Sequence, residues 1–323
     1  MKNQLRRPAN FAVVRQRTSK ITVACLRTVF LIGLCYLFLF PLFYLGLTAI
    51  ADPKSFDDPS VVWIPNALNF SSFKTAFEKF DFGGSIWLTI QSSVLGTVAA
   101  LVSCSLVGYG FARFQFFEKK LAFGLVILTI IVPPQTLLIS QYLQFRNFDF
   151  GGVLRLFEPV TGTGSISLIS SVWVFVLPAM FATGLRNGLF IFIFRQFFAG
   201  LPKDLEEAAR IDGCGTLKTF VRVIVPITIP SFVTVTLFSF VWHWNDFYTS
   251  DMLFDTDVKP LIPMLKMFQG AMSKLAASEP YSANEIRSWT AAVTLLTIAV
   301  PLILYIITQR FFVESVERTG IVG

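Results

Sequence analysis

The chain has 323 residues, enough for about two soluble domains, but its composition excludes a soluble globular protein. Hydrophobic residues make up 54% and charged residues 15% of it, whereas an average soluble domain has about 25% charged residues. Its 36 phenylalanines and a mean hydropathy of +0.65 indicate surfaces that face lipid. The net charge of +7 leaves nucleic-acid binding open until the basic residues are located.

Six uncharged stretches organise the chain, and each exceeds the about 20 residues that a helix needs to cross a bilayer. They cover residues 28–51, 82–112, 121–145, 159–185, 223–245 and 288–309. The sequence therefore predicts an all-α polytopic membrane protein with six transmembrane helices. Because the apolar core of the first stretch is much longer than the about 7–15 residues of a signal peptide, we expect it to be retained as a helix. Beyond the fourth stretch the apolar pattern resumes after Arg186, which indicates a long span or one broken near Gly184 and Gly188.

Lysine and arginine are distributed unequally between the two sides of these spans. If the N-terminus is cytoplasmic, sixteen basic residues fall in cytoplasmic segments and nine in outside loops. The positive-inside rule then predicts that both termini are cytoplasmic. This bias also accounts for the net charge, so no nucleic-acid partner is expected. The predicted organisation is a cytoplasmic segment (1–27), one membrane domain (28–312) and a cytoplasmic tail (313–323).

The cytoplasmic loop of about 199–226 contains signals for a short helix. Asp204 with Glu207 three residues later has the spacing of a capping box, and Glu206 with Arg210 is a favourable i,i+4 pair. Gly213 supplies the left-handed residue that ends a helix. A helix of about eight residues is unstable alone in water, so we expect a partner surface to stabilise it, with an ordinary solvated connector as the alternative.

Residues Glu207-Ala208-Ala209, then Gly213, then Val223-Ile224-Val225-Pro226 resemble the EAA loop of bacterial ABC-importer permeases. Val223 and Val225 stand where the family pattern has Ile and Leu. Further blocks, spread to the C-terminus, are similar to carbohydrate permeases of the maltose-transporter type. These blocks are Trp63-Ile64-Pro65, Tyr109-Gly110-Phe111-Ala112-Arg113, Phe194-Arg195-Gln196-Phe197-Phe198, Trp244-Asn245-Asp246 and Gln309-Arg310-Phe311-Phe312-Val313.

The resemblance implies the fold of a type I (MetI-like) ABC-importer permease in a bacterial inner membrane. It implies a second permease chain, forming a heterodimer, two ABC ATPase subunits and an extracytoplasmic solute-binding protein as partners, besides membrane lipid. Because the sequence has no Gly-Lys-Ser/Thr phosphate loop, ATP and Mg²⁺ are expected on the ATPase chains and no cofactor on this one. The residues expected to couple to an ATPase are Asp204, Glu206, Glu207, Ala208, Ala209, Arg210 and Gly213.

Polar residues at membrane depth are candidates for a solute pathway because burying them in lipid is costly. The end of the fifth span combines aromatic faces with hydrogen-bonding groups, a mixture that suits sugars, although an aromatic belt at the outer interface is an equal alternative. Arg186 faces either the pathway or, by snorkelling, the interface. The only histidine, His243, is interpreted as structural. The candidate pathway residues are Arg186, Asn187, Trp242, Trp244, Asn245 and Asp246.

The sequence contains no catalytic constellation and no spacing of metal ligands, so we expect neither an enzyme nor a metal site. The predicted function is a permease subunit of an ATP-driven importer of a sugar or oligosaccharide. Alternatives are a permease for glycerol phosphate or another non-sugar solute and, less favoured, a secondary transporter. A secondary transporter usually has inverted repeats and buried carboxylates along its path, and it would leave the EAA loop unexplained.

Overall fold

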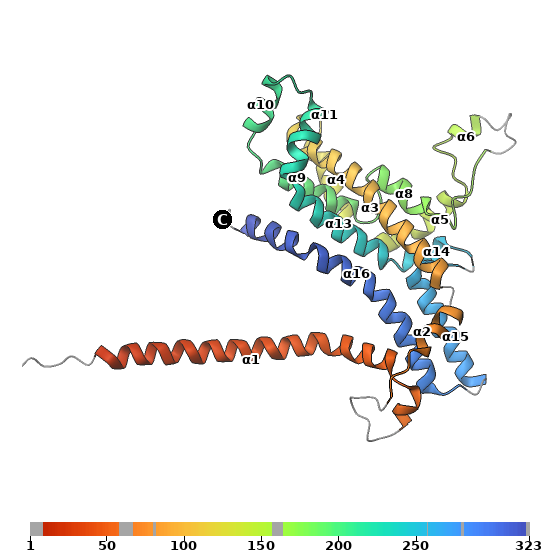
Figure 1. The fold of residues 1–323 in the computed structure, drawn as a ribbon. Coiled ribbons are helices and arrows are strands. Elements are labelled where there is room, and N and C mark those ends of the chain that lie inside the picture. Colours follow the sequence, from red (N-terminus) through yellow and green to blue (C-terminus); the bar gives the residue numbers. More distant parts are fainter. Residues whose placement is uncertain are drawn as a thin grey trace, which may run out of the picture. The chain divides into compact units, whose positions relative to one another are not determined.

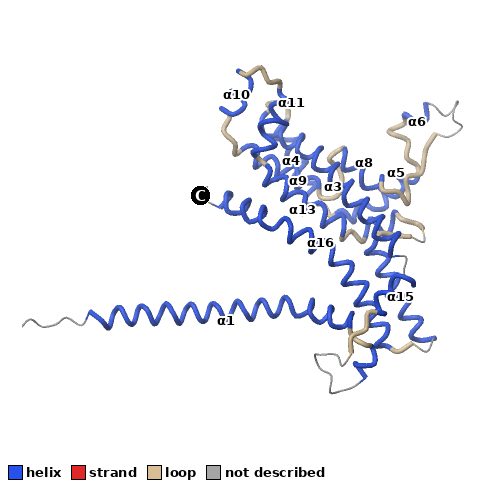
Figure 2. The backbone as a smooth tube through the Cα atoms, viewed as in Figure 1, coloured by secondary structure: helices blue, strands red, loops and turns tan. Residues whose placement is uncertain are grey.

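The structure is a computed structural model that describes residues 9–57, 67–79, 82–156, 164–256, 258–278 and 281–320. The Trp63-Ile64-Pro65 block lies outside these residues. Within them the chain is helical, with two isolated β-bridges, Ala51 to Leu68 and Phe148 to Ile166 (Figures 1 and 2). The chain divides into two units, Met1–Phe73 with Ser282–Leu295 and Lys74–Tyr281 with Leu296–Gly323, which are described separately.

The first unit contains α1 (Ala9–Ile50), the short 3-10 helix η1 (Pro53–Asp57), the start of α2 (Ser71–Lys79) and the start of α16 (Ala283–Gly320). A small core of Ala49, Ala291 and Ala292 joins α1 to α16. The first turn of α16 is capped by Ser282 and Glu285, since each side chain accepts a hydrogen bond from the other residue's amide, at 3.2 and 2.8 Å. The first helix thus contributes to the core of this unit.

The second unit is built around α3 (Phe82–Arg113), which packs against α8 (Trp173–Met180), α9 (Asn187–Ala199) and α13 (Ile229–Trp244). Small residues on α3 allow a close approach of the helices. A Cβ at Gly108 would lie 2.7 Å from Phe194 Cβ and 3.1 Å from the Arg195 amide nitrogen on α9. The contact between α3 and α9 therefore depends on glycine at this position.

Two of the predicted spans are bent sharply at prolines. Helix α4 (Lys119–Ile131) meets the segment of η2 (Pro134–Leu137) and α5 (Leu138–Arg146) at 97° after Pro133. At the fifth stretch, the segment of α11 (Thr216–Thr219), the π-helical turn η3 (Phe220–Ile224) and α12 (Val225–Ile227) meets α13 at 81°. Proline removes a backbone donor and prevents a continuous helix, which explains both breaks.

Three described helices are long and apolar enough to cross a membrane, Lys20–Ile50, Phe82–Arg113 and Ala283–Arg310, and the number rises to five if each bent pair is one span. The fourth stretch and the apolar pattern after it form α8 and α9, which are separated by a turn with left-handed residues at Ala182 and Arg186. The break predicted near Gly184 is therefore confirmed, whereas the count of six spans stays a prediction.

The remaining described helices of this unit are α6 (Val153–Leu156), α10 (Asp204–Ile211), α14 (Tyr248–Leu253) and α15 (Leu261–Ser278). The start of α15 is held by α3, since the Leu261 amide donates to Thr89 Oγ1 at 2.7 Å in a buried contact. Thr89 Oγ1 in turn donates to the Ser85 carbonyl at 2.7 Å, so this hydroxyl both accepts and donates a hydrogen bond.

Candidate functional site

The helix expected in the cytoplasmic loop is present as α10, although it begins differently from the prediction. Asp204 is its first helical residue rather than its cap, so the predicted capping box is wrong. The amides of Glu206 and Glu207, which a cap would bind, donate instead to the Lys203 carbonyl at 2.9 and 3.1 Å. The three acidic residues Asp204, Glu206 and Glu207 lie in the first turn, where negative charge is stabilised by the helix dipole.

The end of α10 agrees with the prediction. Gly213 has φ +76°, the left-handed conformation in which glycine is favoured. The amide of Cys214 donates to the Ala209 carbonyl at 2.9 Å, and the amide of Gly213 donates to the Arg210 carbonyl at 3.0 Å. This pair of hydrogen bonds is a Schellman motif, which satisfies the last carbonyl groups of the helix.

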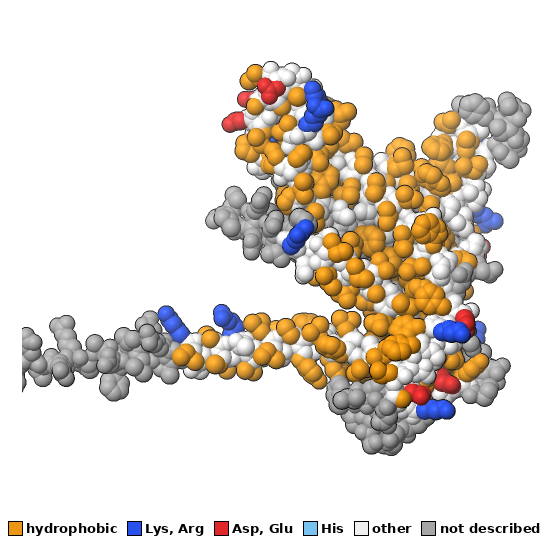
Figure 3. Space-filling model, in the orientation of Figure 1, with side chains coloured by type: hydrophobic (Ala, Val, Ile, Leu, Met, Phe, Trp, Pro, Cys, Tyr) orange, Lys and Arg blue, Asp and Glu red, His pale blue; other side chains and the backbone are white. Residues whose placement is uncertain are grey.

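One face of α10 is buried in the unit, and the other is open. Glu206 and Ala209, three residues apart, are buried, whereas the other residues expected to couple to an ATPase are exposed. Apolar side chains extend the open surface, since Ile211 is 87% and Leu217 is 67% exposed. In Figure 3 charged side chains gather at the end of the unit that carries α10, in contrast to the hydrophobic flanks of the helices. The exposed candidate residues are Asp204, Glu207, Ala208, Arg210 and Gly213.

The buried face of α10 is held by an ion pair to the last residue of α3. Arg113 Nε lies 2.6 Å from Glu206 Oε1, and both side chains are less than 10% exposed. Arg113 also donates from Nη2 to the Leu201 carbonyl at 3.0 Å. Among the described residues the ion-pair partner of Glu206 is thus Arg113, and the predicted pair with Arg210 is not the one formed. Removal of one partner would leave a buried unpaired charge, at a cost of about 3–5 kcal/mol.

Aromatic residues surround this ion pair. Tyr109, one turn before Arg113 on α3, packs against Phe198 of α9 and Phe220 of η3, with ring centroids 5.8 and 4.9 Å apart. All three are buried. Sequence reasoning placed Arg113 only among the cytoplasmic basic residues and in a family block, so its contact with Glu206 was missed. The sequence signal that could have indicated this contact was an arginine at the end of an apolar span that also carries Tyr109.

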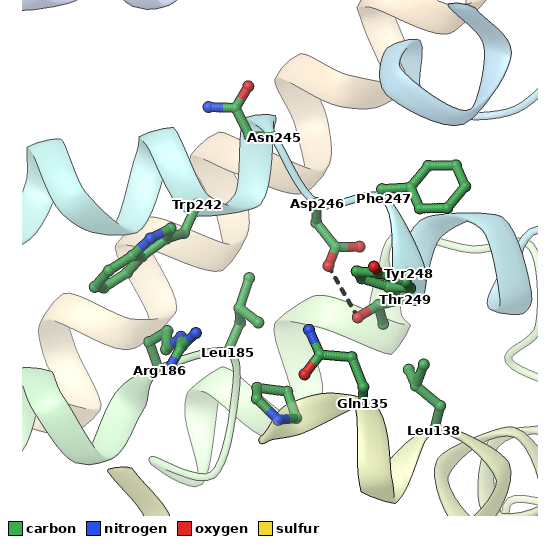
Figure 4. Close-up of a pocket in the computed structure, with 11 residues that line it drawn as sticks. Gln135, Leu138, Leu185, Arg186, Trp242, Asn245, Asp246, Phe247, Tyr248 and Thr249 are labelled. Atoms are coloured by element: carbon green, nitrogen blue, oxygen red, sulfur yellow. Dashed lines mark hydrogen bonds between the residues drawn. The ribbon is translucent and has the colours of Figure 1, made fainter. Parts of the chain in front are cut away.

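A cavity of about 220 Å³ lies where α13, α14 and the turn before α9 meet the bend at Pro134 (Figure 4). Four of the six candidate pathway residues line it. Gln135 reaches it from the proline bend, and Tyr248 and Thr249 reach it from α14. These four candidate residues are Arg186, Trp242, Asn245 and Asp246.

Arg186 and Trp242 form the aromatic and cationic part of this lining. The Arg186 guanidinium lies 5.6 Å from the centre of the Trp242 ring, within the range of a cation–π contact. Arg186 has φ +59° and immediately precedes α9, so its side chain is presented from a tight turn. It is exposed, and both residues also line an adjacent cavity of about 530 Å³. A planar ring and an accessible cation suit a sugar ring that carries hydroxyl or acidic groups.

Asp246 uses both carboxylate oxygens within the chain. Thr249 Oγ1 donates to Oδ1 at 3.0 Å, and the Ser250 amide donates to Oδ2 at 2.7 Å, so the side chain holds the start of α14. In Figure 4 the carboxylate points to Thr249, whereas the exposed Asn245 points away from Gln135. Asp246 therefore shapes the cavity wall.

The other candidates hold helices together. Trp244 is buried, and its Nε1 donates to the Thr297 carbonyl of α16 at 3.1 Å. Asn187 is buried, and its Nδ2 donates to the Ala179 carbonyl of α8 at 3.3 Å. His243 is also buried, with Nδ1 2.8 Å from the Ser239 carbonyl. These contacts are consistent with the structural interpretation of His243.

Comparison with known proteins decides the family. Residues 92–318, more than half of the chain, match the family described as "Binding-protein-dependent transport system inner membrane component". The chain belongs to this family. It is therefore a membrane component of a transport system and not an enzyme. Among the described residues no group of three or more His, Cys, Asp or Glu side chains is placed to hold a metal ion.

Individual relatives and a solved structure match this chain along nearly its whole length. The polygalacturonan/rhamnogalacturonan permease protein YtcP of Bacillus subtilis is 24% identical over 91% of this chain and 96% of that protein. The arabinooligosaccharide permease protein AraQ of Halalkalibacterium halodurans is 26% identical over 96% of this chain and its own full length. A chain from the crystal structure of a bacterial ABC transporter for alginate superposes with a TM-score of 0.69 at 19% identity, covering 96% of this chain and all of that one. The last match establishes the permease fold of ABC importers.

Proposed function

We propose that this permease forms half of the transmembrane pathway of an ATP-driven carbohydrate importer and couples to a cytoplasmic ATPase through α10. The observation that carries the coupling role is the division of α10 into a buried face, held by Glu206 and Arg113, and an exposed face. A short helix held on one side only is suited to dock against another protein. Glu207, Ala208 and Ile211 would contact the ATPase.

The partners follow from this role. They are a second permease chain in a heterodimer, two ABC ATPases that use ATP and Mg²⁺, and a solute-binding protein outside the membrane. A second structural match, with a TM-score of 0.57, is a chain of a bacterial alginate ABC transporter in complex with a periplasmic protein that holds an alginate pentasaccharide. Carbohydrate as the solute class is supported by the names of YtcP and AraQ and by the aromatic and polar lining of the cavity.

The proposed placement is a bacterial inner membrane with both termini in the cytoplasm. The membrane domain would cover 28–312, between an N-terminal segment (1–27) and a C-terminal tail (313–323). The unequal distribution of basic residues supports this orientation. In a cysteine-free background, Leu205→Cys should resist an impermeant thiol reagent added outside spheroplasts and react after lysis. Labelling from outside would contradict the proposed topology.

For the solute pathway we propose a division of roles within the cavity. Arg186 and Trp242 would contact the solute, and Asp246 would order Thr249 at the cavity wall. Asn187 and Trp244 would hold the helices that frame it, since their polar groups bind backbone carbonyls. Asn245, which is exposed, would lie at the rim.

A second solute class is favoured by one observation. The exposed cation of Arg186 in the cavity also suits a phosphate, and the glycerol-3-phosphate permease protein UgpE of Yersinia enterocolitica is 24% identical over 84% of this chain. Uptake of neutral sugars, acidic oligosaccharides and glycerol phosphate by the assembled complex would separate these classes.

The deciding experiment is purification of the permease from its native membrane, followed by uptake measurements in proteoliposomes. We expect ATPase chains to co-purify and uptake to require ATP. Uptake driven by an ion gradient without ATPase chains would reject the proposal in favour of a secondary transporter.

A further inference from the structure

We propose that Arg113 and Glu206 are positioning residues that transmit movement of α10 to α3, the central helix of the second unit. This inference rests on the proposed coupling role of α10. It assigns a function to the buried side of that helix, which no ATPase surface can contact while the ion pair is closed.

The ion pair connects α10 and the loop before it to the end of α3. Arg113 is the last residue of α3, and its guanidinium binds the loop at two points, Glu206 Oε1 at 2.6 Å and the Leu201 carbonyl at 3.0 Å. Leu201 precedes α10 and Glu206 lies in its first turn, so both contacts are at the same end of the short helix. One guanidinium thus holds both the loop and the first turn of α10 close to the end of α3.

The surroundings of the pair lead from this end of α10 into the helix core. Tyr109 on α3 adjoins Glu206 and packs against Phe198 and Phe220, which precede and follow α10 in sequence. Helix α3 then contacts α8, α9 and α13 along its length. A displacement of α10 therefore reaches α3 through a charged contact and reaches its neighbours through packed side chains.

The opposite end of α10 lacks a comparable tie among the residues that the structure describes. Ile211 is almost fully exposed, and the helix ends in the Schellman motif at Gly213. Arg210 is exposed as well. The ion pair therefore lies at the N-terminal end of the helix, and a push on the exposed face would act about it.

The test measures coupling in the complete complex, with both permeases, the ATPases and the solute-binding protein in nanodiscs or proteoliposomes. The variants are Glu206→Gln, Arg113→Gln and the exchanged pair Arg113→Glu with Glu206→Arg. Asp149→Asn is the matched control, because Asp149 forms an ion pair with Arg155 at 3.2 Å elsewhere in the unit. The readouts are ATPase per permease after purification and solute transported per ATP hydrolysed.

For complexes that have assembled, we expect each single variant to transport about tenfold less solute per ATP, a loss that an effect on assembly alone would not produce. The exchanged pair should recover at least about a third of the original ratio, since it restores the charge contact but not the bond to Leu201. An unchanged ratio in both single variants, with all losses in assembly, would overturn the inference. So would an exchanged pair that is as impaired as the single variants.

A second measurement does not depend on the ATPases. Ala209 is buried on the same face as Glu206, so Ala209→Cys reports whether α10 leaves its site. In the full chain in membranes, on a background without other cysteines, Glu206→Gln should raise the labelling rate of this cysteine by about tenfold. An unchanged rate would reject the positioning role. Failure of ATPases to co-purify with the parental chain would instead reject the proposed function and leave this measurement to judge the ion pair.

Discussion

The two polar regions of the second unit satisfy their carboxylates in different ways. At α10 the Glu206 carboxylate binds a cation on another helix, and neighbouring Glu207 is exposed. At the cavity the Asp246 carboxylate binds residues three and four positions ahead, Thr249 and Ser250. A carboxylate bound to a distant helix joins two elements, whereas one bound to its own loop sets a local shape. The following substitutions separate these two uses of a carboxylate.

The largest effect is expected from Gly213→Val, which places a β-branched residue at φ +76°. The left-handed conformation costs a residue with a Cβ about 1–2 kcal/mol, and more if it is β-branched. The Schellman motif should open, and the yield of ATPase-bound complex should fall by about tenfold, as measured by co-purification. Gly215→Val, at φ −71°, is the control and should be close to parental. Equal yields for both variants would remove the special role of Gly213.

The next effect is expected from Asp246→Ala, which removes both acceptors at the start of α14. Loss of such cap-like hydrogen bonds costs about 1–2 kcal/mol, so the melting temperature of the purified complex should fall. Uptake per assembled complex should stay near parental if the residue only shapes the cavity wall. Asp255→Ala, an exposed residue nearby, is the control. A tenfold loss of uptake per assembled complex would instead place Asp246 in contact with the solute.

Glu207→Ala should have a smaller effect, confined to docking. Because the side chain is exposed, the stability of the permease should change by no more than about 0.5 kcal/mol. The affinity for the ATPase should fall several-fold, by about 1 kcal/mol, measured by titration of the purified ATPase onto the permease pair in nanodiscs. Unchanged affinity would move the docking surface away from this face of α10.

The smallest effect is expected from Arg186→Lys, which keeps the charge but loses the planar contact with Trp242. An exposed cation–π contact contributes about 0.5–1 kcal/mol. Because this contact holds Arg186 where the solute is proposed to bind, half-maximal uptake should require a few-fold more solute. Arg146→Lys is the matched control, because Arg146 lies over Tyr142 at 5.9 Å outside this cavity. An equal response of both variants would argue against solute contact at Arg186.

The sequence was sufficient for features that depend on neighbouring residues. Gly213 ends α10 because a left-handed residue is needed there, as its sequence position predicted. The start of α10 was misplaced by one residue because the carbonyl of Lys203 competes for the amides that a cap would bind. Local spacing cannot distinguish these two acceptors.

Contacts between residues far apart in the chain could not be predicted from the sequence. The pattern favoured Arg210 as the partner of Glu206, but a buried arginine at the end of α3 forms the ion pair. Likewise, the sequence does not distinguish the roles of Trp242 and Trp244. Trp242 lines the cavity, whereas Trp244 donates to the Thr297 carbonyl. Two residues along a helix point to different neighbours, and only the packing of other helices decides which of them meets a cavity.

The hydroxyl of Thr89 has a consequence for the order in which the chain folds. An amide in the first turn of a helix has no partner within that helix, and for Leu261 the partner is supplied by α3. The first turn of α15 is therefore completed only after α3, made much earlier during synthesis, is in place beside it. Until then this amide needs water or another acceptor, so α15 is expected to acquire hydrogen-exchange protection at its start later than α3 does. One hydroxyl on α3 thus links the completion of α15 to the prior placement of α3.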